Sequence, residues 1–503
     1  MGGQADTIET EPTAGEDAPA RRRLDLDRTY ILVALLAVAL VGLARQVEPA
    51  DFWWHLASGR HIVETGSIPT TDIFSWTQAG EPFFTQPWLA QVLMYLFHSL
   101  GGLPLLLVIH AVLLTGGYAL LLRECVAITG RERLSALTLL LFTLPPSVIN
   151  WSVRPQSWAI PLFLASLVLL SAYRRGGATR AIWLLPLLMA LWVNLHGAFV
   201  TGLALVGVTV VVEGWRTWRG HAGGLTPERW WRLMAVAATT GAAVFANPRG
   251  VGVIAYVVEL LTSSTVAPLV TEWSVPEATS LYGALFFGAS LVLIAALTLT
   301  PRPPSATDLL IAAAFWVLAL TAIRHALWFA AAGAPVLARA IVARTPAPEP
   351  RAGAPAVSVG LLGIVMLGLV MASPWVRPLV FDGQRGELVG SLTPVAAVAA
   401  LQGEAQAQLR LFNYEAAGSY LIWQTPEQPV FIDPRFEFYP PQQWDDYRDL
   451  SAGRRVEELI AQYEFEGFIV DVERQAPLVT ALEELEGWAV AHRDERAALF
   501  LPR

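Results

Sequence analysis

One polar segment, residues 50–89, contains residue types that could perform acid–base chemistry beside a membrane. Asp51 and His55 are four positions apart, so a helix that begins here would place both on one face. A carboxylate in this position could accept the proton of a hydroxyl group. Trp53 and Trp54 lie between them, where they could rest against lipid headgroups. The alternative is an interfacial aromatic belt with Asp51 as a helix cap, but its place directly after a hydrophobic stretch favours a functional acid.

Other unusual polar residues lie at the ends of hydrophobic stretches or in loops, on the same predicted side of the membrane as Asp51. Arginine is suited to bidentate contact with phosphate, although each arginine could instead extend to the interface. With Asp51 as the candidate catalytic residue, the candidate substrate-binding residues are His55, Arg60, Asp72, Arg154, Gln156, His196, Glu272, Arg324 and His325. The loop at 247–278, which includes Glu272, could form a lid or line an acceptor groove, or could simply pack.

No cofactor motif accompanies these residues. The sequence contains no phosphate-binding glycine loop, no zinc motif, no paired cysteines and no serine-nucleophile motif. Asp51, Asp72 and Glu272 could hold a divalent cation through oxygen ligands, although no spacing requires one. No nucleic-acid partner is expected.

The elements that must position these residues are membrane helices. The chain has 503 residues, of which 54% are hydrophobic and 15% charged, and its mean hydropathy is +0.48. This composition is typical of an all-α polytopic membrane protein. We expect about eleven transmembrane helices, near 29–46, 103–122, 134–150, 156–173, 180–194, 197–214, 230–246, 279–300, 307–322, 326–343 and 356–374.

One further apolar run, 88–100, is ambiguous, and the arginines decide how to interpret it. If it lies on the outer surface as an interfacial helix, fourteen loop arginines face the cytoplasm and four face outward. Cytoplasmic loops are normally the arginine-rich ones. We therefore predict eleven spans, a cytoplasmic N-terminus and an outer C-terminus.

The chain divides into three predicted parts. Residues 1–28 read as a disordered cytoplasmic tail, and residues 29–378 as the transmembrane domain, with its first outer loop at 47–102. Residues 379–503 carry about twice as many acidic as basic residues and alternate strand-like with helical runs, which predicts a small extracytoplasmic α/β domain. The strand-like runs are 409–413, 429–433, 467–471, 488–494 and 497–501.

Four alternating polar residues stand out within this C-terminal part. Asp433, Arg435, Glu437 and Tyr439 are two apart, so an extended chain would place all four on one face. They could form a structural row of ion pairs, or they could contact the acceptor or the membrane domain.

The first outer loop resembles that of the C-type glycosyltransferases, specifically the bacterial relatives of protein O-mannosyltransferase and of the lipid A aminoarabinose transferase. Asp51 matches the acid that follows the first span, and Gly66 matches the glycine that ends an amphipathic helix. Residues 80–83 match a Gly-x-Pro-aromatic stretch, and 88–100 matches a juxtamembrane helix. The sequence departs from the family where its second acid is Phe52 and where its Lys-Pro-Pro is Gln-Pro-Trp at 86–88.

The resemblance implies an integral membrane glycosyltransferase of the bacterial cytoplasmic membrane. Such an enzyme would transfer a hexosyl or pentosyl group from a polyprenyl-phosphate donor to an extracytoplasmic glycan, lipid or protein. Asp51 would activate the acceptor, and Arg154 or Arg324 would replace the missing lysine at the phosphate. The alternative is a membrane protein that binds or flips lipid-linked saccharides without cleaving them.

Overall fold

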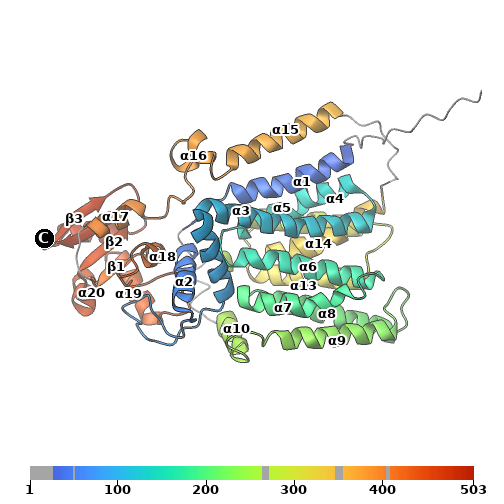
Figure 1. Ribbon diagram of the computed structural model, residues 1–503, viewed down its shortest axis with the longest axis horizontal. Coiled ribbons are helices and arrows are strands. Elements are labelled where there is room, and N and C mark those ends of the chain that lie inside the picture. Colours follow the sequence, from blue (N-terminus) through green and yellow to red (C-terminus); the bar gives the residue numbers. More distant parts are fainter. Residues whose placement is uncertain (1–25, 49–50, 263–270, 346–354, 404–407) are drawn as a thin grey trace, which may run out of the picture.

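The computed structural model describes residues 26–48, 51–262, 271–345, 355–403 and 408–503. It shows a long bundle of roughly parallel and antiparallel helices with a small mixed domain at one end (Figure 1). Most of the predicted N-terminal tail lies outside the described residues. The domain boundaries stay predictions.

The bundle is built from the predicted apolar runs, because a chain in lipid must satisfy its backbone hydrogen bonds within each segment. Its helices are α1 (Leu26–Leu43), α3 (Trp88–Thr129), α4 (Glu132–Thr138), α5 (Leu144–Ser147), α6 (Gln156–Arg174), α7 (Leu184–Leu195), α8 (Phe199–Trp218), α9 (Pro227–Ala243), α12 (Leu281–Leu299), α13 (Ala306–Thr321), α14 (Ala326–Val342) and α15 (Pro355–Ala372).

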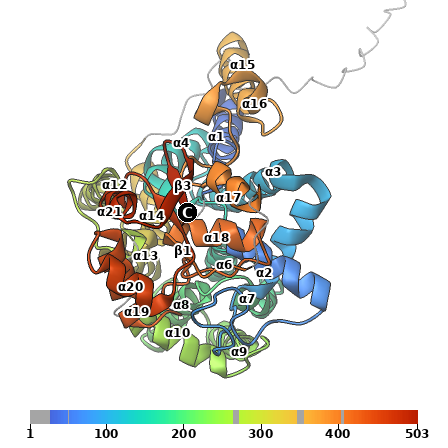
Figure 2. The same cartoon turned by 90° about the vertical axis from the view of Figure 1, so that its left-hand side faces the viewer.

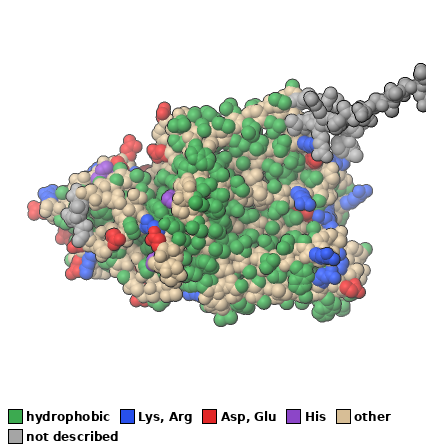
Figure 3. All heavy atoms as spheres, in the orientation of Figure 1, with side chains coloured by type: hydrophobic (Ala, Val, Ile, Leu, Met, Phe, Trp, Pro, Cys, Tyr) green, Lys and Arg blue, Asp and Glu red, His purple; other side chains and the backbone are tan. Residues whose placement is uncertain are grey.

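The protein is a multi-pass membrane protein. Among the described residues, seven helical segments are long and apolar enough to cross a membrane, and three shorter apolar helices accompany them. The helix α9 belongs to neither group, so the count of eleven spans stays a prediction. In Figure 3, hydrophobic side chains cover the visible face of the bundle, and blue basic side chains gather at the end away from the C-terminal domain. This is the distribution that the positive-inside rule describes for a cytoplasmic face.

Two helices lie across the opposite end of the bundle. They are α2 (Phe52–Thr65) and the first part of α3, and in Figure 1 both run across the ends of the membrane helices. The long α3 is interrupted at Gly101 and Gly102, and Gly102 has a φ of 64°, which glycine adopts without strain. This break separates the ambiguous run 88–100 from the span that follows it. The run 88–100 was predicted to be an interfacial helix separate from the following span, and the structure has a break between the two.

The C-terminal domain contains a four-stranded sheet in the order β1-β2-β4-β3. Its elements are α17 (Val395–Gly403), β1 (Leu411–Asn413), α18 (Glu415–Gln424), α19 (Pro441–Ser451), α20 (Val456–Tyr463), β2 (Gly467–Asp471), α21 (Ala476–Glu484), β3 (Trp488–Arg493) and β4 (Ala497–Pro502). The strands β1 and β2 are parallel, whereas β4 runs antiparallel to both of its neighbours. Four of the five predicted strand segments form this sheet.

The fifth predicted strand, 429–433, is wrong. The side chain of Asn413 accepts a hydrogen bond from the backbone of Phe431 at 2.9 Å and donates one to Ile432 at 2.7 Å. Val430 forms a single bridge to Ser75 of the first loop, but an amide side chain bonds the next two residues, so the chain bends instead of extending. Of the four alternating polar residues, Asp433, Arg435 and Tyr439 contact one another, as the structural alternative predicted. Glu437 lies apart from this group, in a turn at 436–438.

The C-terminal domain shares a hydrophobic core with the first loop, so it is not a separate appendage. Trp53 contacts Tyr420 of α18 edge-on at 5.1 Å and stacks with Trp423 at 6.5 Å. Trp53 and Trp54 are only 4% and 7% exposed. The expectation that they face lipid headgroups is therefore wrong: they are buried beneath the C-terminal domain. Figure 2, viewed from that domain, shows α18 lying over this end of the bundle.

Candidate active site

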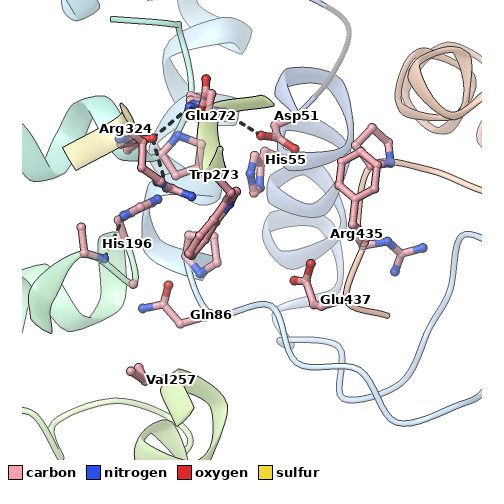
Figure 4. Close-up of a pocket in the computed structure, with 18 of the residues that line it drawn as sticks. Asp51, His55, Gln86, His196, Val257, Glu272, Trp273, Arg324, Arg435 and Glu437 are labelled. Atoms are coloured by element: carbon pink, nitrogen blue, oxygen red, sulfur yellow. Dashed lines mark hydrogen bonds and ion pairs between the residues drawn. The ribbon is translucent and has the colours of Figure 1, made fainter. Parts of the chain in front are cut away.

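A cavity of about 210 Å³ lies where the bundle, the first loop and the C-terminal domain meet. Eight of the ten residues singled out in the sequence line it: Asp51, His55, Arg154, Gln156, His196, Glu272, Arg324 and His325. They come from five separate stretches of the chain. Figure 4 shows most of their side chains around one central space.

Asp51 occupies the cap position at the start of α2, but its side chain makes no capping hydrogen bond. Instead, its Oδ2 accepts a hydrogen bond from Nη1 of Arg154 at 3.1 Å. Its Oδ1 makes no hydrogen bond to any described residue. The side chain of Asp51 is 28% exposed, so this second oxygen is accessible to a ligand.

Arg154 stands between two carboxylates. It precedes Pro155, where α6 begins, and its Nη2 pairs with Glu272 while also donating to Oε1 of Gln156 at 3.0 Å. Burial opposes the charge of Arg154, but Glu272 and Asp51 outweigh it, so the pKa of the guanidinium is raised. The interaction fixes the orientation of both carboxylates.

Arg324 is the second guanidinium of the cavity, and it has a different environment. Its Nη2 reaches Oε1 of Gln156 at 3.4 Å, and its guanidinium lies 4.5 Å from the ring centre of Trp273. No carboxylate of the described residues lies within ion-pair distance of it. Arg324 therefore presents unneutralised positive charge to the cavity, as an anion-binding residue does.

Three histidines complete the predicted set. The Nδ1 of His55 lies 2.9 Å from the amide nitrogen of Gln91, which must donate, so His55 accepts at Nδ1 and carries its proton on Nε2. Burial lowers the pKa of His55, and Arg154 lowers it further. Burial likewise lowers the pKa of His196, with Arg324 adding to the effect. Both imidazoles are therefore neutral near pH 7, and His325 is tied to the carbonyl of Leu318 at 3.2 Å.

Two predicted residues lie outside the cavity. Arg60 covers the ring of Trp423 at 4.4 Å and donates to its carbonyl, so it attaches α2 to the C-terminal domain. Asp72 is buried and pairs with Arg435 at 2.6 Å. Both are structural contacts, because the loop folds under the C-terminal domain, which the sequence alone did not indicate.

The carboxylates do not form a metal centre. Asp72 lies apart from Asp51 and Glu272, and the guanidinium of Arg154 separates the latter two. Among the described residues, no group of three or more histidine, cysteine or acidic side chains could hold a metal ion. The divalent cation considered from the sequence does not fit these residues.

Several cavity residues were missing from the predicted site. They include Trp54, Gln86, Tyr256, Trp273, Trp328, Phe436 and Glu437. Gln86 was noted among the outer polar residues and as a departure from the family pattern, but not as a site residue. Its amide donates to the carbonyl of Val193 at 2.5 Å. Glu437 was noted as part of the alternating polar row. Its distance of nearly 400 positions from Asp51 gave no sign that the two share a cavity.

No family model and no curated protein sequence matches the chain. Its structure nevertheless resembles the oligosaccharyltransferase of Archaeoglobus fulgidus, with a TM-score of 0.52 and 12% identity over 95% of this chain and 74% of that one. It also resembles ArnT from Cupriavidus metallidurans, with a TM-score of 0.51 and 14% identity over 93% and 97% of the two chains. These structures are C-type glycosyltransferases.

The chain has the C-type glycosyltransferase fold. The arabinofuranosyltransferase AftD from Mycobacteria shares it, with a TM-score of 0.54 and 14% identity over 95% of this chain and 42% of AftD. The ArnT structure contains undecaprenyl phosphate, and a structure of the archaeal oligosaccharyltransferase contains a dolichol-phosphate. The resemblance inferred from the first loop thus extends to the fold.

Proposed function

We propose that the protein is a membrane glycosyltransferase that transfers a sugar from a polyprenyl-phosphate donor to an extracytoplasmic acceptor. The observation that carries this proposal is the presence, in one cavity, of an oriented carboxylate at Asp51 and an unneutralised guanidinium at Arg324. The first is suited to accept a proton, and the second to hold a phosphate. Lipid phosphates bound to proteins of the same fold support the donor class.

In the proposed reaction, Oδ1 of Asp51 removes the proton from an acceptor hydroxyl. The oxygen of the acceptor hydroxyl attacks the anomeric carbon of the donor sugar, and the bond from that carbon to the phosphate oxygen breaks. The phosphate leaves with the bonding electrons and remains on its polyprenyl chain. Direct displacement of this kind inverts the configuration at the anomeric carbon.

Arg324 and Arg154 have different roles in this mechanism. Arg324 binds the phosphate and stabilises the negative charge that develops as the bond breaks, which is the effect expected of a positioned cation. Arg154 acts as a positioning residue because its pairing with Asp51 and Glu272 leaves it little capacity for another anion. Gln156 accepts from both guanidiniums and sets their separation.

We further propose that the cavity faces outward from a bacterial cytoplasmic membrane, with the C-terminal domain outside. The arginines at the opposite end of the bundle support this orientation. A panel of hexosyl and pentosyl donors would determine which kind of sugar is transferred.

The test is transfer by purified protein in lipid nanodiscs, given a panel of polyprenyl-phosphate monosaccharides and cell-envelope extract. The wild type should consume one donor and release polyprenyl phosphate. Asp51→Asn should lower kcat by roughly 10²- to 10⁴-fold, the range for loss of a general base. Asp445→Asn, at an exposed position of α19, is the matched control and should behave as the wild type.

The rival function makes a different prediction. A protein that only binds or flips lipid-linked saccharides would retain the donors but consume none of them. Full transfer by Asp51→Asn would also overturn the mechanism, since no proton acceptor would remain at that position.

A further inference from the structure

The wall of the cavity that comes from the C-terminal domain contains a carboxylate with no assigned role. Residues 434–437 line the cavity, and the side chain of Glu437 is exposed to it. Glu437 makes no ion pair and no hydrogen bond with any other described residue. In Figure 4 it lies across the central space from Arg324, and its carboxylate points toward the space beside His55.

A buried ionic network holds Glu437 in this position. Asp433 accepts from Nε of Arg435 at 2.8 Å and from the hydroxyl of Tyr439 at 2.5 Å, and Arg435 also pairs with Asp72 at 2.6 Å. The guanidinium of Arg435 further lies 4.7 Å from the ring centre of Phe83. Phe438, on the other side of Glu437, also contacts Phe83 edge-on with 5.1 Å between the ring centres, so the turn that presents Glu437 is joined to the first loop on both sides of the residue. Its direction into the cavity follows from these contacts.

The cavity contains more carboxylates than guanidiniums. Arg324 and Arg154 both donate to Oε1 of Gln156, so the two guanidiniums lie near each other, and Arg324 has no ion-pair partner among the described residues. Asp51, Glu272 and Glu437 supply three carboxylates against these two guanidiniums. Once a phosphate neutralises Arg324, the remaining charge of these groups is negative, because His55 and His196 are neutral. A second anion would then be repelled.

We propose that Glu437 forms the acceptor subsite, where its carboxylate accepts hydrogen bonds from the hydroxyl groups of an uncharged saccharide and excludes anionic acceptors. An ionised carboxylate only accepts hydrogen bonds, so it pairs with hydroxyl donors and not with another acid. The aromatic rings of Trp54 and Phe436, which also line the cavity, supply apolar surface for a sugar ring. That the bound saccharide is the acceptor rests on the proposed glycosyl transfer, whereas the binding of a saccharide at Glu437 does not depend on it.

The proposal is tested by ligand binding that requires no turnover. Neutral methyl glycosides (glucoside, mannoside, galactoside and arabinofuranoside) and the anionic methyl glucuronide are titrated by saturation-transfer NMR against the full chain in nanodiscs. Undecaprenyl phosphate is present to occupy Arg324. The variants are Glu437→Gln and, as the matched control, Glu457→Gln on the exposed side of α20, where the glutamate has no described partner.

At least one neutral glycoside should bind the wild type, and its Kd should rise about tenfold in Glu437→Gln, as expected for losing a hydrogen bond to a charged group. Methyl glucuronide should bind the wild type more weakly and Glu437→Gln more tightly. Glu457→Gln should match the wild type throughout. In an active preparation, Glu437→Gln should raise the acceptor KM and leave the donor KM and kcat nearly unchanged.

Three results would overturn the proposal: no neutral glycoside binds the wild type, Glu437→Gln binds glycosides as the wild type does, or Glu437→Gln changes the Kd of undecaprenyl phosphate instead. Failure of the proposed glycosyl transfer looks different. In that case the glycoside titrations would follow the expected pattern, but no polyprenyl-phosphate sugar would be consumed.

Discussion

Two arginines that are each held between two carboxylates, Arg154 and Arg435, lie in opposite environments. Arg154 lies between Asp51 and Glu272 at the cavity, where the three side chains are 15%, 28% and 20% exposed. Arg435 lies between Asp433 and Asp72 beneath the C-terminal domain, where the exposure is 1%, 0% and 0%. One arrangement is open to a ligand, and the other is sealed.

The difference lies in the hydrogen bonds that remain available. Asp72 accepts from Ser75 and from two backbone amides in addition to Arg435, and Asp433 accepts from Tyr439 as well as Arg435. Asp51, in contrast, uses one oxygen on Arg154 and leaves the other without a described partner. Saturated carboxylates stabilise a structure, whereas an oriented carboxylate with a spare lone pair can react. Residue type alone therefore does not distinguish the two clusters.

Removing the sealed arginine should have the largest effect on stability. Arg435→Met leaves two buried carboxylates unpaired, which should lower the free energy of unfolding by about 3–5 kcal/mol. Chemical denaturation followed by fluorescence of the C-terminal domain would measure the change. Arg448→Met in the same domain, at an exposed pair with Asp445, should produce no measurable change. Equal stability of the two variants would show that the sealed network is not structural.

Substitution of Arg154, the arginine at the cavity, should affect activity strongly and stability only weakly. Arg154→Met should lower kcat roughly 10²-fold, because Asp51 and Glu272 lose the group that orients them. Its Tm should change far less than that of Arg435→Met, since the cavity admits water to the freed carboxylates. Arg154→Lys should recover part of the activity by keeping the charge. A large loss of stability with kcat preserved would place Arg154 with the structural network instead.

Local sequence patterns identified most of the polar cavity residues, but they did not show which distant segments contact one another. Polar residues at the ends of apolar runs, such as Arg154, His196 and Arg324, were found because lipid makes charged and polar groups conspicuous. Arg60 and Asp72 lie outside the cavity for one reason: both lie under the C-terminal domain, and no local pattern shows that a distant domain covers them. Glu437 was missed as a cavity residue for the same reason.

The fold shows the same division. Long apolar runs predicted the membrane helices, and arginine counting separated 88–100 from the span that follows, where the structure has its break at Gly101 and Gly102. The segment 429–433 has a strand-like sequence but is bent by the side chain of Asn413. A tertiary hydrogen bond of this kind overrides local propensity, and no sequence window contains both partners.

Substitution of Arg324 should have a smaller effect, limited to the binding of a phosphate in the cavity. Arg324→Met should raise the Kd of undecaprenyl phosphate about 10- to 100-fold, the equivalent of one or two hydrogen bonds to a charged group. Native mass spectrometry or a fluorescent lipid-phosphate analogue would measure it. Arg302→Met, at an exposed loop position, is the matched control and should bind as the wild type. Unchanged binding in Arg324→Met would transfer the phosphate to another cation.

The smallest expected effect concerns the charge of Glu437 in the ligand-free protein. Although its side chain is exposed to the cavity, the surrounding protein displaces bulk water from Glu437, and this desolvation raises the pKa of its carboxyl group, with Asp51 adding to the shift. Between the ordinary and the raised pKa, the folded protein binds more protons than the unfolded chain, so the free energy of unfolding falls as pH rises through this window. Glu437→Gln cannot ionise and should therefore have a slightly higher Tm than the wild type at pH 7.5. The difference should disappear as the pH falls below 4.5, whereas Glu457→Gln should show no such trend.

A higher Tm for Glu437→Gln would mean that the ionised carboxylate of Glu437 lowers the stability of the ligand-free protein. A residue that only packs would not lower stability in this way, so the result would agree with a role in binding the acceptor. If the Tm of Glu437→Gln instead fell below that of the wild type at pH 7.5, the carboxylate would belong with the sealed network of Arg435.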